Sequence, residues 1–510
     1  MADISSGNRR IAKNTLLLYF RMLFTMLINL YMSRIVLQTL GADDYGIYSV
    51  VGGVVVLFSF LTNAMSSSTQ RFLNFNLGLQ DSHKVSKVFN ISILTHLTIF
   101  FVVLVLSETV GLWFLVSQMN MPEERTYAVM WVYQMSVLSA LLGVMVIPYR
   151  ASVIASEMMS VFALVSIIEV LLKLIVVLLL PFFSEDNLIL YSVLISVVSL
   201  FVLILYVIVC YRKLPFTKLK WYWDKYQYRE MMSFSSWYLF GGMAMVGSKQ
   251  GTNILINIFF NVAVNAAVGI ANQVRSAIYG FITSFQTAFN PQIVKLYATE
   301  DYPRMLGLIF RSSKFSYLLL FILSFPVFLY CDEILSIWLV EVPVYSSAFT
   351  RLVIISSLFE ALSVPLSTAI GATGRIKYYQ IYVSAVLLLN IPLIYFVLSL
   401  GASPVYAFII NLFVNMLAYL YRLMYIRKYV KYNYREYFFR VLFPCIKVTI
   451  LSIPIPLLIK VYYQASIVST LAFIAVTVVT AAAFAMLFGL DEGERNYLKQ
   501  ITSKVSARFR

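Results

Sequence analysis

The stretch LLLYFRMLFTMLINLYMSRIVL, which runs from Leu16 to Leu37, decides the fold class of this chain. It is almost entirely apolar, and about 20 such residues are enough for an α-helix to cross the hydrocarbon core of a bilayer. Arg21 nevertheless lies inside the stretch, where an arginine costs about 2.5–3.5 kcal/mol even on the mildest insertion scale. A membrane helix is therefore predicted here, and its internal charge needs an explanation.

The composition extends this prediction to the whole chain. Its 510 residues are 61% hydrophobic and 12% charged, with a mean hydropathy of +0.83. Soluble domains of this size are not so apolar. The apolar runs have the length of membrane helices, whereas a transmembrane barrel would show short alternating strands. We therefore predict an all-α, polytopic membrane protein.

Fourteen apolar runs are long enough to span a bilayer. We place them at 13–36, 46–66, 88–107, 127–148, 158–180, 187–210, 233–258, 262–289, 313–330, 349–370, 379–399, 404–424, 439–460 and 466–489. The run at 233–258 is the least apolar, because glycines and polar residues interrupt it.

The charges of the turns predict the orientation. Turns after odd-numbered spans are acidic, as in GADDYG and FSEDN, and turns after even-numbered spans are basic, as in YRKLPFTKLKWYWDKYQYR. Because basic residues stay inside, both termini are expected in the cytoplasm. This bias accounts for most of the net charge of +16, so we expect no nucleic-acid partner. The basic, Tyr/Trp-rich loops are expected to contact anionic membrane lipid.

Motifs of enzymatic chemistry do not stand out in the sequence. Cys210, Cys331 and Cys445 are scattered, and His83 and His96 are isolated, which predicts neither a disulfide framework nor a metal site. We find no nucleophile motif, phosphate loop or pair of catalytic carboxylates. The protein is expected to be no enzyme and to need no cofactor other than a coupling ion.

The two halves of the chain resemble each other. LINLYMS at 27–33 matches LINIFFN at 255–261, and LQDSHKVSKVF matches ATEDYPRMLGLIF further along. VIPYRASVIASE matches SVPLSTAIGATG, which aligns Pro148 with Pro365. The matches follow in order, with offsets that drift only from 228 to 217. This series indicates an internal duplication.

The repeat unit contains six spans, and an even number keeps both copies in the same orientation. We therefore predict two parallel six-helix lobes, related by an axis along the membrane normal, plus two extra helices. The predicted divisions are an N-lobe at 1–215, a basic aromatic linker at 216–232, a C-lobe at 233–430, helices 13 and 14 at 431–490, and a cytoplasmic tail at 491–510. Such lobes enclose a cavity and can rock to give alternating access.

Arg21 begins a polar stripe that recurs in the second half. On the first helix the stripe consists of Arg21, Thr25, Asn29 and Ser33, one every fourth residue and so on one face. At an offset of 228 the counterparts are Lys249, Asn253, Asn257 and Asn261. Polar stripes of membrane helices face protein or water rather than lipid. Both stripes are therefore predicted to line the cavity.

The next helix adds a third cation, Arg275. It shares a polar face with Asn272, Tyr279 and Gln286, and Asn63 is the approximate match of Gln286 in the first half. We expect Arg21, Lys249 and Arg275 to converge near the middle of the membrane and to bind an anionic substrate. Arginine suits phosphate because its planar fork donates two parallel hydrogen bonds.

Only two acids, Glu169 and Glu360, lie deep within predicted spans. Glu360 is expected either to carry a coupling ion, H⁺ or Na⁺, or to balance the cations of the cavity, and Glu169 is a second coupling candidate. The structural alternative is internal pairing of the membrane charges, with Arg21 or Arg275 bound to Glu360 and Lys173 bound to Glu169.

The opening of the chain, KNTLLLYFRMLFTMLINLYMSRIVLQTLGADDYGIYSVV, and the later SSSTQRFLNFNLG resemble polysaccharide-repeat-unit flippases. These belong to the multidrug/oligosaccharidyl-lipid/polysaccharide exporter superfamily. The resemblance extends over essentially the whole chain. It implies transport of undecaprenyl-pyrophosphate-linked oligosaccharide to the outer leaflet of the bacterial inner membrane. It also implies polysaccharide polymerase components as candidate partners.

Several alternative functions remain open at this point. Drug exporters of the same superfamily are the closest competitor, although they use buried acids in the N-lobe where this chain begins its stripe with Arg21. A membrane glycan polymerase or ligase would need a large outer loop, and the outer turns here are short. A scaffold or lipid scramblase would not need polar residues at matched positions in both halves.

Overall fold

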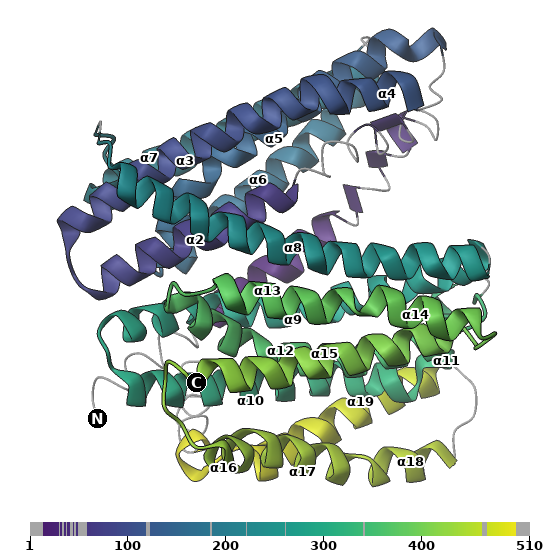
Figure 1. Ribbon diagram of the computed structural model, residues 1–510. Coiled ribbons are helices and arrows are strands. Elements are labelled where there is room, and N and C mark those ends of the chain that lie inside the picture. Colours follow the sequence, from purple (N-terminus) through teal and green to yellow (C-terminus); the bar gives the residue numbers. More distant parts are fainter. Residues whose placement is uncertain are drawn as a thin grey trace, which may run out of the picture. The chain divides into compact units, whose positions relative to one another are not determined.

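The computed structural model describes residues 14–29, 31–32, 35–36, 38–40, 44, 47–48, 51, 59–118, 123–183, 186–220, 222–260, 262–339, 342–461 and 467–495. Within these residues all regular secondary structure is helical (Figure 1). The predicted all-α class is therefore confirmed. Ser33, Asn261 and the side chain of Asn63 lie outside the described residues.

The longer helices of the first half overlap the predicted spans, although α2 ends twelve residues beyond the span predicted at 46–66. Residues 14–29 are helical and are followed by α2 (Ser59–Gly78), α3 (Ser82–Leu106), α4 (Leu112–Gln118), α5 (Thr126–Ala155), α6 (Met159–Leu179) and α7 (Asn187–Lys213). The helices of the second half are α8 (Lys225–Phe259), α9 (Val262–Ala298), α10 (Tyr302–Leu329), α11 (Cys331–Trp338), α12 (Ser346–Ala372), α13 (Lys377–Leu388), α14 (Asn390–Ser399) and α15 (Val405–Ile426). The remaining helices are α16 (Tyr434–Tyr437), which precedes the span predicted at 439–460, and α17 (Phe443–Ser452), α18 (Pro454–Val461) and α19 (Ile467–Phe484), which overlap the last two predicted spans.

Ten helical segments among the described residues are long and apolar enough to cross a membrane. Two further helices, α8 with 35 residues and α9 with 37, have the length but carry many polar side chains. These two helices hold the polar residues that the sequence assigns to the cavity. Their lower hydropathy is therefore what a cavity lining requires, since a face turned away from lipid need not be apolar.

The chain forms two compact units. The first contains residues up to Met243 together with Thr287–Glu300, and the second contains Ala244–Gln286 together with the residues from Asp301 onward. In the first unit α5 packs against α2, α3 and α7, and in the second α12 packs against α10 and α15. The start of α8 and the end of α9 thus belong to the first unit. The lobe boundaries at 215, 233 and 430 stay predictions.

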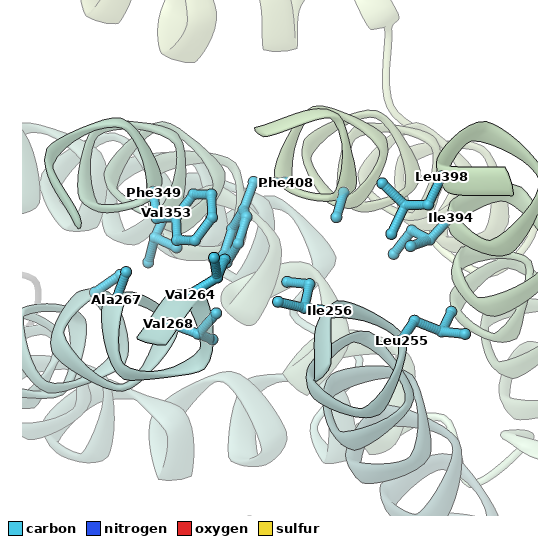
Figure 2. Close-up of a cluster of buried hydrophobic side chains, with 12 residues drawn as sticks. Leu255, Ile256, Val264, Ala267, Val268, Phe349, Val353, Ile394, Leu398 and Phe408 are labelled. Atoms are coloured by element: carbon cyan, nitrogen blue, oxygen red, sulfur yellow. The ribbon is translucent and has the colours of Figure 1, made fainter. Parts of the chain in front are cut away.

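Apolar side chains from five helices form a core of the second unit (Figure 2). The members come from α8, α9, α12, α14 and α15, and they are Leu255, Ile256, Val264, Ala267, Val268, Ala271, Phe349, Val353, Ile394, Leu398, Ala407 and Phe408. The rings of Phe349 and Phe408 stack with centroids 4.2 Å apart. This cluster fixes α8 and α9 against α12, so it determines how their polar faces are presented.

Two turns show that the duplication is structural. Gln80 and Glu300, which the repeat aligns, both have left-handed backbones with φ of 56° and 57°. The next residues, Asp81 and Asp301, both cap the following helix by accepting a hydrogen bond from the backbone nitrogen three residues on, at 3.0 and 3.2 Å. Equal strain and equal caps at aligned positions favour a common origin of the two halves.

The aligned prolines do not end their helices. Pro148 lies inside α5, which continues to Ala155, and Pro365 lies inside α12, which continues to Ala372. A proline at the end of a predicted span can terminate a helix, but neither Pro148 nor Pro365 does so. Prolines are tolerated within membrane helices because neighbouring helices and side chains satisfy the freed backbone groups.

One arginine joins three of the predicted outer turns in the first unit. The guanidinium of Arg125 donates to Asp44 at 3.0 Å and to Asp186 at 2.6 Å. Asp186 also caps α7 by accepting hydrogen bonds from the backbone nitrogens of Leu188 and Ile189. The three acidic turns therefore lie at one end of the unit, as alternating spans require.

Candidate substrate-binding site

Arg21 stands on the first helix without a carboxylate partner among the described residues. Its guanidinium carbon lies 4.7 Å from the centre of the Phe162 ring, which α6 supplies. Its Nε is buried and has no hydrogen-bond partner in the described part of the chain. Arg150 and Tyr206 interact with it electrostatically. The guanidinium thus rests on an aromatic ring, and its Nε–H can still donate a hydrogen bond to a ligand.

Arg150 is a cation that the sequence analysis missed. It lies on α5, two residues after Pro148, in the segment that the span at 127–148 left out. Tyr206 of α7 is buried and interacts electrostatically with both Arg21 and Arg150. The available signal was the run PYR, which becomes part of a membrane helix once Pro148 is read as internal.

The other members of the first stripe are less engaged. The hydroxyl of Thr25 donates to the Met22 carbonyl oxygen of its own helix at 3.0 Å. Asn29 is exposed. Among the described members of the stripe, Arg21 is the one for which a contact with a side chain of another helix, Phe162, is seen.

A second cluster gathers around Glu360 in the second unit. Arg275 of α9 forms an ion pair with Glu360 of α12, and its guanidinium also lies 5.1 Å from the ring centre of Tyr279. Lys249 of α8 interacts electrostatically with both Arg275 and Glu360. The structure thus brings together two of the three predicted cations, with one acid between them.

Arg422 of α15 is a further cation that the sequence analysis did not single out. It interacts electrostatically with Tyr279, and its Nε donates to the hydroxyl of Tyr379 at 3.1 Å. Its sequence signal was weak, because Arg422 lies near the end of the span predicted at 404–424, next to the basic residues that follow it. The helix α15 instead carries it to the neighbourhood of Tyr279.

The asparagines of the second stripe do not join this cluster. The side chain of Asn253 donates to Gln250 on its own helix at 2.8 Å, and Asn257 and Asn272 are exposed. Gln286, by contrast, is buried on α9. As in the first unit, the cation of the stripe is engaged while most of its amides are not.

Both deep acids have cationic partners, as the structural alternative predicted. The carboxylate of Glu169 accepts from Lys173, one turn away on α6, at 2.6 Å. Glu360 is bound by Arg275 rather than by Arg21. The alternative is thus confirmed for Glu169 and for Arg275. The convergence of Arg21 with Lys249 and Arg275 joins residues of different units and stays a prediction.

A metal centre is not evident in the described ranges. No group of three or more His, Cys, Asp or Glu side chains among them could hold a metal ion. The three cysteines are buried and free.

Comparisons with known proteins place these clusters in a transporter fold. The MatE family matches residues 239–396. A multidrug resistance MATE family transporter of the MOP superfamily, solved in an outward-facing conformation, matches with a TM-score of 0.70 at 12% identity, covering 84% of this chain and 97% of the other. The MATE transporter ClbM in complex with Rb⁺ matches with a TM-score of 0.69 at 15% identity, covering 84% and 97%.

A third solved structure has the same fold. The bent form of the Vibrio cholerae MATE transporter VcmN matches with a TM-score of 0.68 at 14% identity, covering 86% of this chain and all of the other. The comparison with curated proteins gave no match. The fold confirms the all-α membrane architecture, and ten candidate membrane spans lie among the described residues. The count of fourteen stays a prediction. The chain thus matches the MatE family over residues 239–396 and has, over most of its length, the fold of the MATE transporters.

Proposed function

We propose that this chain is an alternating-access flippase for undecaprenyl-pyrophosphate-linked oligosaccharide in the bacterial cytoplasmic membrane. The observation that carries the proposal is the excess of cations in both clusters. The first unit offers Arg21, Arg150 and Lys173 against Glu169, and the second offers Lys249, Arg275 and Arg422 against Glu360. Each unit therefore keeps more positive than negative charge beside its polar helices.

A pyrophosphate is the part of this substrate that such charges fit. It carries negative charge that cannot cross hydrocarbon unaided, whereas the polyprenyl tail can stay in lipid. An arginine whose Nε has no partner in the described part of the chain, as in Arg21, can donate to phosphate oxygens in the fork geometry. A substrate held by both lobes favours the conformation in which they close around it, which is how binding biases alternating access.

The competing proposal is a drug or metabolite exporter of the same superfamily. The fold fits it equally, because one similar structure is a multidrug resistance transporter. A cationic drug would meet net repulsion in both clusters, so the charge balance favours the flippase or an exporter of anions. The complex of ClbM with Rb⁺ makes a monovalent cation a reasonable coupling ion here, with Glu360 or Glu169 as its candidate carrier.

The deciding experiment follows the lipid-linked glycan. Purified protein would be reconstituted into liposomes that contain the lipid-linked repeat unit of its own pathway, and the glycan reaching the outer leaflet would be oxidised by an impermeant reagent. Flipping faster than in protein-free liposomes supports the proposal. Transport of a dye or drug without any glycan flipping would establish the exporter instead.

In cells, a deletion should cause lipid-linked glycan to accumulate on the inner leaflet. The polymerase components of the same pathway would be the partners that receive the flipped product. Both termini are expected in the cytoplasm, which impermeant labelling of a tag at the C-terminus would check.

A further inference from the structure

Three turns that the charge pattern assigns to the cytoplasmic side meet in the first unit. The carboxylate of Glu157, just after α5, accepts from Lys295 of α9 at 2.7 Å and from Gln292 at 3.2 Å. The Glu157 side chain is 1% exposed. Gly78, at the end of α2, lies so close to α9 that a Cβ would stand 2.8 Å from the Lys295 carbonyl oxygen. The end of α9 is therefore held by a buried ion pair and by a contact that only glycine permits.

Glu157 keeps an unfavourable backbone conformation in this arrangement. Its φ is +57°, and its counterpart in the repeat is Gly374, with φ of +75°. Glycine adopts this region at no steric cost, whereas a side chain with a Cβ is strained there. The second half thus uses the residue that the turn prefers. The first half uses one whose carboxylate binds α9, and strain of this kind is typical of functional positions.

Beside the pair lies a small apolar cluster that reaches the candidate site. Leu18, Ile154, Met159 and Ala288 are its buried members, and Phe162 packs against them. The same Phe162 ring carries the guanidinium of Arg21. Phe162 therefore packs against the cluster that holds α9 at Ala288 and also contacts Arg21, the proposed substrate ligand.

The helix α9 is the element that this contact would control. It runs without interruption from Val262 to Ala298 and carries Arg275 in its second-unit part and Lys295 in its first-unit part. Pro291 lies inside it, one turn before Lys295. A proline removes one helical hydrogen bond and allows a bend, so the last turns of α9 can move separately from the rest.

We propose that Glu157 and Lys295 form a latch that closes the cytoplasmic side of the transporter. In this structure the latch is engaged. When the cytoplasmic side opens, the ion pair breaks, the Gly78 contact separates, and α9 withdraws Ala288 from the apolar cluster that it forms with Leu18, Ile154 and Met159. The proposal rests on alternating access but not on the nature of the cargo, so it and the substrate assignment can fail separately.

The test measures how often Ala288 becomes accessible. Cys210, Cys331 and Cys445 would be replaced by alanine, Ala288→Cys introduced, and the purified protein placed in nanodiscs, where a maleimide reaches both faces. We expect Glu157→Gln and Lys295→Gln each to raise the labelling rate about tenfold, the change that 1.4 kcal/mol produces in an equilibrium. The charge swap Glu157→Lys with Lys295→Glu should restore slow labelling.

Two further variants separate the effect of the Glu157 carboxylate from the effect of its left-handed backbone. Glu157→Gly relaxes the backbone but removes the carboxylate, so a latch predicts fast labelling, whereas a purely structural turn predicts slow labelling as in the parent. Glu300→Gln changes an exposed acid with the same left-handed backbone and should leave the rate unchanged. Slow labelling in Glu157→Gln, Lys295→Gln and Glu157→Gly would overturn the latch. If the charge-swapped protein is still labelled fast, the ion pair is not what protects the cysteine at position 288.

Discussion

The two cation clusters hold their arginines in different ways. Arg275 of the second unit has a dedicated acid, Glu360, and a tyrosine ring beside it. Arg21 of the first unit has the ring of Phe162 and a buried Nε without a partner in the described part of the chain. An arginine bound to a carboxylate is largely neutralised in the resting protein. One that is stacked on a ring retains its charge and its donors for a ligand.

This difference teaches that a duplicated polar stripe can serve two roles. The repeat aligns Arg21 with Lys249, and each begins a polar face. Lys249 interacts electrostatically with the ion pair of Arg275 and Glu360, whereas the charged neighbour of Arg21 is a second arginine, Arg150. We therefore expect the first unit to depend on its cations for binding, and the second unit to depend on its ion pair for folding as well.

The largest expected effect comes from breaking the pair of the second unit. Arg275→Ala leaves Glu360 without its direct partner, and removing one partner of a buried pair costs about 3–5 kcal/mol. Because Glu360 is 35% exposed, we expect the lower end of that range, and a several-fold loss of folded protein in the membrane. Abundance and thermal unfolding of the purified protein would measure it.

The second change in the same pair is the control. Adding Glu360→Gln to Arg275→Ala removes the unpaired charge and should restore most of the abundance. Lys249→Ala, in the same cluster but outside the direct pair, should keep abundance normal and reduce transport. If Arg275→Ala is as abundant as the parent, Arg275 is not needed for folding, and the distinction between a structural Arg275 and a substrate-binding Arg21 is wrong.

Arg21→Ala should show the opposite pattern, with normal abundance and strongly reduced flipping. A hydrogen bond to a charged group is worth about 1.5–3 kcal/mol, which corresponds to a loss of roughly 10- to 100-fold. Arg21→Lys keeps the charge and loses the fork, so it should retain partial activity. The measurement is abundance and flipping in parallel.

The result that excludes a ligand role for Arg21 is specific. If Arg21→Ala lowers abundance, and a second change at Glu360 then restores full transport, the arginine balances that acid rather than binding substrate. Glu360→Gln alone tests coupling: normal flipping across a range of imposed ion gradients would remove this carboxylate from the mechanism.

A smaller effect is expected at Arg150, which stands beside Arg21. Arg150→Gln removes one positive charge from the cluster but leaves the guanidinium of Arg21 on Phe162, so substrate affinity should fall about three- to tenfold while the protein stays folded. The matched control combines Lys173→Gln with Glu169→Gln, which removes an ion pair and leaves the net charge of the cluster unchanged. An equal loss of affinity in both variants would contradict a specific role for Arg150.

The sequence predicts the helices well because the bilayer sets their length. The predicted spans at 127–148 and 187–210 coincide with α5 and α7, although α5 continues seven residues further, to Ala155. That extension hid Arg150, because a proline near a predicted boundary reads as a stop in isolation. The tertiary environment that allows the helix to continue is not written in the local sequence.

The partners of the buried charges were harder to predict than their positions. Periodicity places Arg21, Arg275 and Glu360 on polar faces, but which cation meets Glu360 depends on the packing of α9 against α12. The pair of Glu169 and Lys173 was predictable because both lie on one helix, four residues apart. Contacts within one helix follow from spacing, whereas contacts between helices require the core around Phe349 to be known.

The smallest expected effect concerns the acidic outer turns, where the pKa of Asp186 gives a pH dependence. Burial raises this pKa, but the hydrogen bonds from Arg125 and from the backbone nitrogens that begin α7 outweigh it, so the pKa lies below its ordinary value. The unfolded carboxyl, with a pKa of about 3.9, therefore binds its proton at a higher pH than the folded one. The contribution of Asp186 to stability is complete above about pH 4 and is lost as the pH falls through the lowered pKa.

Because the pair is partly exposed, this contribution should stay below about 1 kcal/mol. The melting temperature of the purified protein should fall more steeply below about pH 4 in the parent than in Asp186→Asn, which has no carboxylate to titrate. Asp81→Asn is a poor substitute for this control, since hydrogen bonds from the backbone and side chain of Lys84 lower the pKa of Asp81 too. Parallel melting curves of the parent and Asp186→Asn over this range would show that Arg125 ties the outer turns together without contributing measurably to stability. Such a result would separate the turns joined by Arg125, whose charges only hold the turns together, from the charges of the candidate site and of the latch of Glu157 and Lys295, which are expected to affect function.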